Sequence, residues 1–226
     1  MQNVPIYVNL IFWATSIIAI PVFFKATNRS TPTIFILSAW LIFQIFPSVY
    51  GFYLITDTLP PRFLLLVAPP FLFIFLLFIT PFGRKYLDSL NIKRLTLFHM
   101  IRIPVEFVLF LLCIHKAVPE LMTFEGRNFD ILSGISAPFI YYYGFVKQKL
   151  NKKIILVWNF ICLGLLLNIV ISAVLSAPFP FQQFAFDQPN IAVLYFPFTW
   201  LPSLLVPLVL LSHLASIRQL LLSPKK

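Results

Sequence analysis

Residues 154–177 read IILVWNFICLGLLLNIVISAVLSA and contain no charged side chain. A helix needs about 20 apolar residues to cross the hydrocarbon core of a bilayer, so this run is long enough to do so. The rest of the chain repeats the pattern, because its charged residues lie mostly in short clusters between apolar runs of similar length. The sequence therefore predicts an all-α fold, a polytopic transmembrane helical bundle.

Composition also argues against an ordinary soluble protein. Of the 226 residues, 60% are hydrophobic and 11% are charged, whereas soluble domains have roughly 45–50% apolar and 25% charged residues. The 19 prolines are spread partly through the apolar runs, where membrane helices tolerate them because neighbouring helices satisfy the freed backbone groups. The bilayer is thus the predicted solvent, and membrane lipids are predicted partners.

About seven spans are predicted, with connections too short to form a soluble domain or a flexible linker. The predicted spans are 4–24, 33–55, 63–83, 97–117, 130–146, 154–177 and 191–217. Residues 84–96 are expected to form a short interfacial helix. Residues 1–226 are accordingly predicted to be a single transmembrane helical domain.

Lys and Arg side chains are distributed unequally between the two sets of connections. One set and the tail hold Lys25, Arg29, Arg84, Lys85, Lys93, Arg94, Lys147, Lys149, Lys152, Lys153, Arg218, Lys225 and Lys226. The other set holds only Arg62, Lys116 and Arg127. Because basic connections stay in the cytoplasm, the N-terminus is predicted outside and the C-terminus inside. The same placement explains the net charge of +10 without a nucleic-acid partner.

A weak internal repeat is also suggested. The third and seventh predicted spans each follow an outer loop in which an Asp precedes a Pro, Asp57 before Pro60 and Asp187 before Pro189. Both spans contain several prolines and end in basic residues. If the fourth span is a connector, the arrangement is three, one and three spans in parallel repeats.

The predicted fourth span carries the strongest functional signal. His99, Arg102 and Glu106 are three and four residues apart and so share one helical face. An ionised group at mid-helix costs roughly 2.5–3.5 kcal/mol, so this stripe should face the bundle interior. Glu106 is then a candidate proton carrier, ion ligand or general base, with Arg102 binding an anionic group. The alternative is a structural pair in which Arg102 and Glu106 neutralise each other.

Three further polar residues at membrane depth extend the candidate substrate- or proton-binding set: Asn159, Asn168 and His213. With the predicted orientation, His99, Arg102, Asn159 and His213 fall in the cytoplasmic half, and they can meet if their helices are neighbours. Interhelical hydrogen bonding is the alternative role for the two Asn residues.

The connection at residues 119–130 is the most polar one on the predicted outer side. Glu120, Glu125, Arg127 and Asp130 are candidates for a lid or entry loop, with Arg127 paired to Glu125 or Asp130 and Gly126 turning the chain. The alternative is a solvated loop that caps the fifth span through Asp130 or Ser133.

Other kinds of chemistry lack a sequence signal. The three His residues are scattered, whereas a metal centre needs three or four converging ligands, so no metal site is predicted. Phosphate-binding, serine-hydrolase and Cys-x-x-Cys motifs are not found in the sequence. No cofactor is indicated.

Three segments, Arg102–Glu120, Met122–Asp130 and Pro178–Asn190, resemble an uncharacterised family of small bacterial membrane proteins. This resemblance implies a bacterial inner membrane but no activity. The segment Pro104-Val105-Glu106-Phe107 is also similar to the Pro-x-Glu-Glu segment of membrane-bound lycopene cyclases, although Phe107 replaces the second carboxylate.

The leading hypothesis from the sequence is a transporter, channel or carrier-like protein with a polar intramembrane site around Arg102 and Glu106. Its ligand would be a small molecule, a lipid or an ion. A membrane-embedded enzyme acting on a lipid or isoprenoid is the first alternative. A receptor-like or structural membrane subunit is the second.

Overall fold

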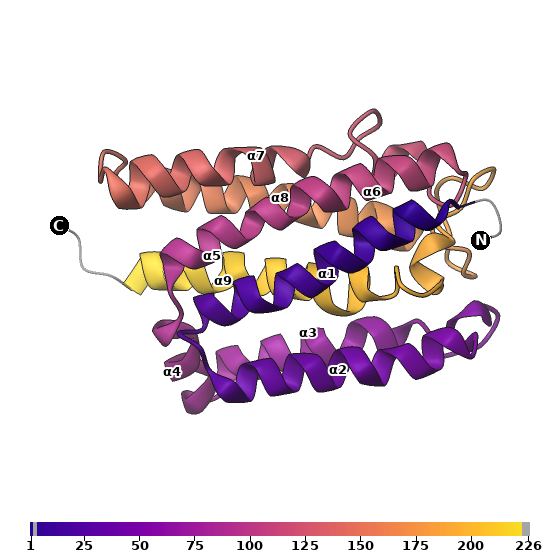
Figure 1. The fold of residues 1–226 in the computed structure, drawn as a ribbon, viewed down its shortest axis with the longest axis horizontal. Coiled ribbons are helices and arrows are strands. Elements are labelled where there is room, and N and C mark those ends of the chain that lie inside the picture. The colour runs from indigo at the N-terminus through magenta and orange to yellow at the C-terminus, as the bar shows by residue number, and fades with distance from the viewer. Residues whose placement is uncertain (2–3, 223–226) are drawn as a thin grey trace.

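The computed structural model describes Met1 and residues 4–222, and within these residues it is a bundle of helices with no strand (Figure 1). The predicted all-α class is confirmed. Most helices of the bundle run along one axis (Figure 1). They are α1 (Ile6–Ala26), α2 (Thr31–Val49), α3 (Leu64–Ile79), α5 (Ile92–Phe98), α6 (Arg102–Ile114), α7 (Ile131–Ile140), α8 (Lys152–Leu175) and α9 (Val206–Leu222).

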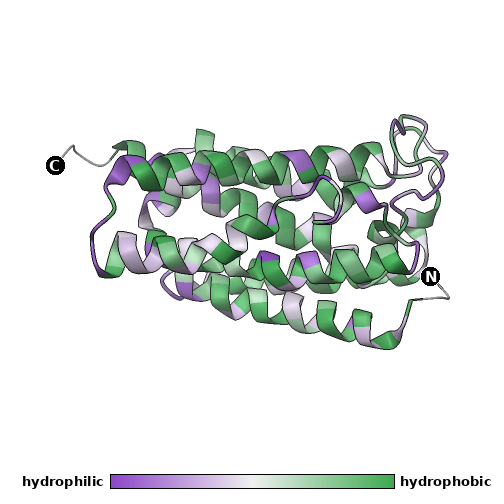
Figure 2. Cartoon of the chain, turned by 90° about the horizontal axis from the view of Figure 1, so that it is seen from above, coloured by the Kyte–Doolittle hydropathy of each residue, from purple (hydrophilic) through white to green (hydrophobic). Residues whose placement is uncertain are grey.

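Five helices in the described part of the chain are long and apolar enough to cross a membrane. These helices span Ile6–Ala26, Thr31–Val49, Ile92–Ile114, Lys152–Leu175 and Leu201–Leu222. The last begins with a π-helical segment, Leu201–Leu205, that continues into α9. Figure 2 shows hydrophobic residues covering most of the bundle and hydrophilic residues gathered mainly in the loops at its ends. These features indicate an integral, multi-pass membrane protein.

Three of the seven predicted spans differ from the expectation. The span predicted at 191–217 starts later, because residues 192–194 form a short 3₁₀ turn and the membrane-length helix begins at Leu201. The run at 63–83 divides into α3 and α4 (Pro81–Ser89), which are bent by 95°, and counting this pair as one span gives six. The run at 130–146 forms α7 and a π-helical end, Tyr141–Val146, and this helix is shorter than 18 residues. The count of seven crossings, like the repeat, stays a prediction.

The bend after α3 has a local cause. Thr80 precedes Pro81 and is extended, with ψ of 145°, as expected for a residue before proline. Thr80 also accepts a hydrogen bond from the Gly83 N–H at 3.1 Å. A Cβ atom on Gly83 would lie 2.4 Å from the backbone of Leu77, so only glycine permits this close turn. The interfacial helix predicted at 84–96 was therefore wrong in its bounds: α4 ends at Ser89, and α5 begins at Ile92.

The basic connections lie together at one end of the bundle, the end at which α9 finishes (Figure 1). The Asn91 N–H donates to the carbonyl of Ala26 at 2.8 Å, which joins the start of α5 to the end of α1. Arg94 Nη1 also donates to the carbonyl of Lys25. Lys225 and Lys226, which entered the predicted orientation, lie outside the described residues.

The same end carries an ion pair between α4 and α9. Arg218 donates from Nε and Nη2 to the two carboxylate oxygens of Asp88, at 2.8 and 2.9 Å. These hydrogen bonds from Arg218 lower the pKa of Asp88. The pair therefore stabilises the fold at pH values above the ordinary pKa of an aspartate.

Replacing Asp88 by asparagine should lower the unfolding temperature at neutral pH by roughly 1–4 °C, the range expected for an exposed pair in a chain of this size. Because the folded-state pKa of Asp88 is depressed, the stabilisation is lost as the pH falls through that pKa. The difference between wild type and Asp88→Asn should therefore shrink in acid. Thermal unfolding in detergent at neutral and acidic pH measures it, and a difference independent of pH contradicts the assignment.

Candidate functional site

The predicted polar stripe lies inside the bundle. The helix that contains it runs without a break through α5, a 3₁₀ turn at His99–Ile101 and α6. Arg102, near the middle of this helix, is 3% exposed, Glu106 is 2% exposed and His99 is fully buried. The stripe therefore faces protein rather than acyl chains.

Arg102 pairs with Asp130 rather than with Glu106. Arg102 Nη1 donates to Asp130 Oδ1 at 2.8 Å, and this ion pair is buried on both sides. Glu106 Oε2 instead accepts a hydrogen bond of 2.5 Å from Asn128 Nδ2. The proposed structural pair of Arg102 with Glu106 is thus wrong, because the loop after α6 supplies separate partners for both side chains.

That loop turns back into the bundle and reaches mid-helix depth. Figure 1 shows α7 starting well short of the end of the bundle at which α6 finishes. Asn128 is locked in place, since its Nδ2 also donates to the carbonyl of Met122 at 3.0 Å and its Oδ1 accepts from the Asp130 N–H at 3.0 Å. Sequence reasoning missed Asn128. The available signal was an Asn two residues before an Asp, a spacing typical of a side-chain-bonded turn.

The predicted lid residues divide into two groups. Glu120, Glu125 and Arg127 are exposed, whereas Asp130 is 3% exposed. Asp130 pairs with Arg102, so its predicted pairing with Arg127 is wrong. A Cβ atom on Gly126 would lie 2.3 Å from the carbonyl oxygen of Glu120, which shows how tightly this loop is folded.

Neither predicted cap of the fifth span is formed. Asp130 occupies the position before α7 but makes no side-chain capping hydrogen bond. The Ser133 hydroxyl is buried and accepts no hydrogen bond from the start of the helix. The first turn of α7 is therefore held by the contacts of Asp130 with Arg102 and Asn128 instead.

The structure brings four of the candidate residues together: His99, Arg102, Asn159 and His213. Arg102 Nη2 lies 3.0 Å from His213 Nε2, and His213 Nδ1 lies 3.0 Å from Asn159 Oδ1. Arg102 can only donate, so Nε2 accepts and Nδ1 carries the proton that it donates to Asn159. The hydrogen bonds therefore assign a neutral His213 with its proton on Nδ1.

His99 belongs to the same cluster by stacking. Its ring lies 3.9 Å from that of His213, centroid to centroid, and 5.6 Å from that of Trp158. Neither nitrogen of the buried His99 ring has a hydrogen-bond partner among the described residues. Asn168, by contrast, lies outside the cluster: it is exposed and donates to the carbonyl of Arg127 at 2.9 Å, tying the outer loop to α8.

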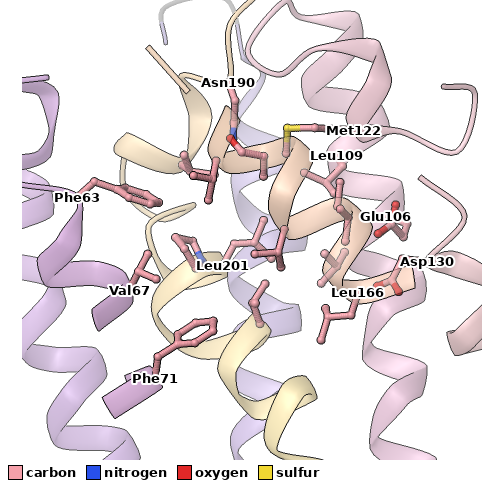
Figure 3. Close-up of a pocket in the computed structure, with 18 residues that line it drawn as sticks. Phe63, Val67, Phe71, Glu106, Leu109, Met122, Asp130, Leu166, Asn190 and Leu201 are labelled. Atoms are coloured by element: carbon pink, nitrogen blue, oxygen red, sulfur yellow. The ribbon is translucent and has the colours of Figure 1, made fainter. Parts of the chain in front are cut away.

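A cavity of about 80 Å³, measured as the space open to the centre of a water molecule, adjoins the two carboxylates. Figure 3 shows Glu106 and Asp130 on one side of it and Phe63, Val67 and Phe71 opposite. Apolar side chains of α3, α6, α8 and the start of the last helix form most of the wall. Asn190, at the top of the view, adds a third polar side chain.

Among the described residues, no group of three or more His, Cys, Asp or Glu side chains could hold a metal ion. The two cysteines are likewise free thiols, Cys113 half-buried and Cys162 buried. The polar cluster contains hydrogen bonds, one ion pair and the stacked rings of His99 and His213.

A family model described as a domain of unknown function, DUF8737, matches residues 59–221. The chain belongs to this family. The DUF8737 match runs from just before α3 almost to the end of α9, and so contains the whole polar cluster and both carboxylates at the cavity. It supports the predicted membership of an uncharacterised family. No curated protein and no solved structure matches the chain.

Proposed function

We propose that the protein is a transporter or carrier-like membrane protein that moves protons, with Glu106 as the group that binds and releases them. The observation that carries this proposal is the unequal pairing of the two buried carboxylates. Asp130 contacts the guanidinium of Arg102, whereas the hydrogen-bond partner of Glu106 among the described residues is the amide of Asn128.

Charge balance favours a proton at this position. One guanidinium faces two carboxylates, so the site carries one excess negative charge when both acids are ionised. A buried charge without a partner is expensive. A proton on Glu106 removes this charge, and its loss restores it. Glu106 is therefore suited to alternate between the two states, which is what a proton carrier requires.

The neighbouring groups suggest a route for the proton. The cavity is larger than the roughly 10–15 Å³ needed to hold one water molecule, and water there would link Glu106 to Asp130. Beyond Asp130, hydrogen bonds link Arg102 to His213 and His213 to Asn159. Arg102 keeps its protons, so these contacts hold the guanidinium against Asp130 and do not carry the proton. The proposed route is therefore the water in the cavity between Glu106 and Asp130, and the cluster around Arg102 fixes the positive charge beside it.

For topology, we propose that the basic end faces the cytoplasm and the N-terminus faces outward, in a bacterial inner membrane. The support is that the basic connections lie at one end of the bundle. The cavity, bordered by Asn190 and Met122 of the outer loops, would then open from the outer half.

Reconstitution into liposomes with an internal pH dye tests the proposed function. An imposed pH gradient should collapse faster in liposomes that contain the protein than in protein-free ones. Equal rates in well-folded preparations at several protein densities would contradict proton carriage.

Replacing His213 by phenylalanine should reduce this flux by about 10-fold, the effect of losing one hydrogen bond to a charged group, because Arg102 Nη2 then lacks its acceptor beside Asp130. Phenylalanine keeps a planar ring, slightly larger than imidazole, but loses both contacts, to Arg102 and to Asn159. His115→Phe is a matched control, because His115 lies at the far end of α6. Similar flux in His213→Phe and wild type would show that the contact of His213 with Arg102 does not support proton carriage.

A membrane-embedded enzyme acting on a lipid or isoprenoid is a second candidate function. The observation that favours it is the apolar wall of the cavity, which suits a hydrocarbon substrate beside an acid or base. Three results together would select this function. The purified protein converts an isoprenoid, Glu106→Gln abolishes the conversion, and the wild-type protein shows no proton flux in liposomes.

A further inference from the structure

A second cavity, here called the groove, lies between α2, α3 and the last helix, Leu201–Leu222. It measures about 370 Å³ as the space open to the centre of a water molecule, which is within the roughly 300–1,000 Å³ of small-molecule sites. No described residue lines both the groove and the cavity at Glu106. The groove is therefore a separate candidate site.

The groove runs along the helix axis from the middle of the bundle to its basic end. Trp40 Nε1, at the middle of α2, donates to the carbonyl of Ser203 at 2.9 Å. At the basic end, the hydroxyl groups of Thr33 and Tyr86 lie 3.0 Å apart and join α2 to α4. Thr33 precedes Trp40 by two turns, about 10 Å at 1.5 Å per residue. Since the hydrocarbon core is about 30 Å thick, the groove occupies one leaflet.

The groove opens sideways to the acyl chains of the bilayer. Two of its lining residues are partly exposed, Ile36 of α2 at 47% and Phe73 of α3 at 45%. Phe23 of α1 and Leu204 of the last helix are each 1% exposed. α1 and the last helix therefore form the floor, and the opening lies between α2 and α3. Most of the lining side chains are apolar, so a lipid chain can enter directly from the bilayer.

Three hydroxyl groups line the groove at its basic end. Thr33 Oγ1 donates to Ser30 Oγ at 3.0 Å, so it accepts from the hydroxyl of Tyr86. The Ser30 hydroxyl proton then has no acceptor within the part of the chain that the structure describes. It is a free donor beside the apolar groove, suited to an anionic oxygen such as that of a phosphate.

Basic side chains adjoin these hydroxyl groups. Arg29 immediately precedes Ser30 in the chain. Lys85 follows Phe82, a lining residue, by three positions and so shares its face of α4. Arg29 and Lys85 are exposed, and neither forms an ion pair with another described residue. Asp88 of α4 is bonded through both oxygens to a basic side chain of α9. This end of the groove therefore complements an anionic head group.

We propose that the groove binds one anionic phospholipid from the leaflet at the basic end. An acyl chain lies between α2, α3 and the last helix, and the phosphate contacts Ser30, Arg29 and Lys85. A zwitterionic lipid supplies the same chain but no net charge to complement the two basic side chains. The inference does not depend on proton carriage, because the groove and the cavity at Glu106 are separate.

Native mass spectrometry of the purified protein in detergent tests this proposal, with phosphatidylglycerol and phosphatidylcholine of the same chains as probes. One phosphatidylglycerol should bind about 25-fold more tightly than phosphatidylcholine, from about 5-fold for each of two basic side chains near the membrane surface. Equal affinities for the two lipids would overturn the proposal. A dimer that binds no lipid would assign the groove to a second copy of the chain and also overturn it.

A pair of double variants tests the role of charge. Arg29→Gln with Lys85→Gln should bring the affinity for phosphatidylglycerol close to that for phosphatidylcholine. Lys149→Gln with Lys153→Gln is the matched control, because it removes the same charge from exposed positions around the connection between α7 and α8. The control should keep the wild-type preference. Equal losses in both double variants would attribute the preference to overall charge and contradict the site.

A bulky substitution tests the groove itself. Leu37→Trp places a larger side chain among the lining residues without changing the charge and should abolish the tightly bound lipid. Leu10→Trp makes the same change on the exposed surface of α1 and should leave binding unchanged. The unfolding temperature in the same detergent shows whether each variant folds. If Leu37→Trp does not fold, the charge variants decide. Wild-type affinity for phosphatidylglycerol in folded Leu37→Trp contradicts the proposal.

Discussion

Replacing Arg102 by leucine should lower the free energy of unfolding by about 3–5 kcal/mol, because it leaves Asp130 as a buried charge without its partner. The ion pair has an N–O distance of 2.8 Å, and its side chains are 3% and 5% exposed. Arg102 also supplies the donor that His213 Nε2 accepts. For a chain of this size the loss corresponds to a fall in unfolding temperature of roughly 6–20 °C. Thermal unfolding in detergent measures it.

A second substitution distinguishes an unpaired charge from lost packing. Adding Asp130→Asn to Arg102→Leu removes the unpaired carboxylate and should restore a large part of the lost stability. Arg218→Leu breaks the exposed pair with Asp88 and is the matched control, with a much smaller effect. If the double variant is no more stable than Arg102→Leu, the ion pair is not what holds this region.

Replacing Glu106 by glutamine should reduce proton flux to the level of protein-free liposomes. Glutamine is nearly the same size and can still accept the hydrogen bond from Asn128, but it cannot bind and release a proton. The fold should therefore persist, and the effect should be confined to transport. Proton flux driven by a pH gradient and the unfolding temperature, measured on the same preparation, distinguish a loss of transport from a loss of folding.

Glu120→Gln is the matched control for this experiment. Glu120 is exposed on the outer loop, and Glu106 is buried at mid-helix. Replacing Glu120 should leave the flux at the wild-type level. Two results would count against Glu106 as the carrier: wild-type flux in Glu106→Gln, or the same loss of flux in both variants.

Apolar runs and helical spacing were enough to predict the parts of the structure that depend on local physics. The uncharged run at 154–177 corresponds to α8, and the three- and four-residue spacing of His99, Arg102 and Glu106 correctly predicted an inward-facing stripe. Both follow from the cost of exposing charge to lipid. The same cost explains why Asn159 and His213 lie beside Arg102.

The partners within the site were not predictable in the same way. Hydropathy treats residues 119–130 as an outer connection, yet the loop carries Asn128 and Asp130 inward to Glu106 and Arg102. Which carboxylate pairs with Arg102 depends on tertiary packing, because the sequence contains two possible partners, Glu106 and Asp130, and does not distinguish between them. The apolar run at 63–83 likewise concealed a bend that the geometry of Thr80 and Gly83 creates.

The most direct test is infrared difference spectroscopy of the reconstituted protein, which detects the carbonyl stretch of a protonated carboxylic acid. A band from a buried carboxylic acid should be present at neutral pH, disappear in Glu106→Gln and remain in Glu120→Gln. Absence of the band in wild type, or its persistence in Glu106→Gln, would show that Glu106 does not hold the proton.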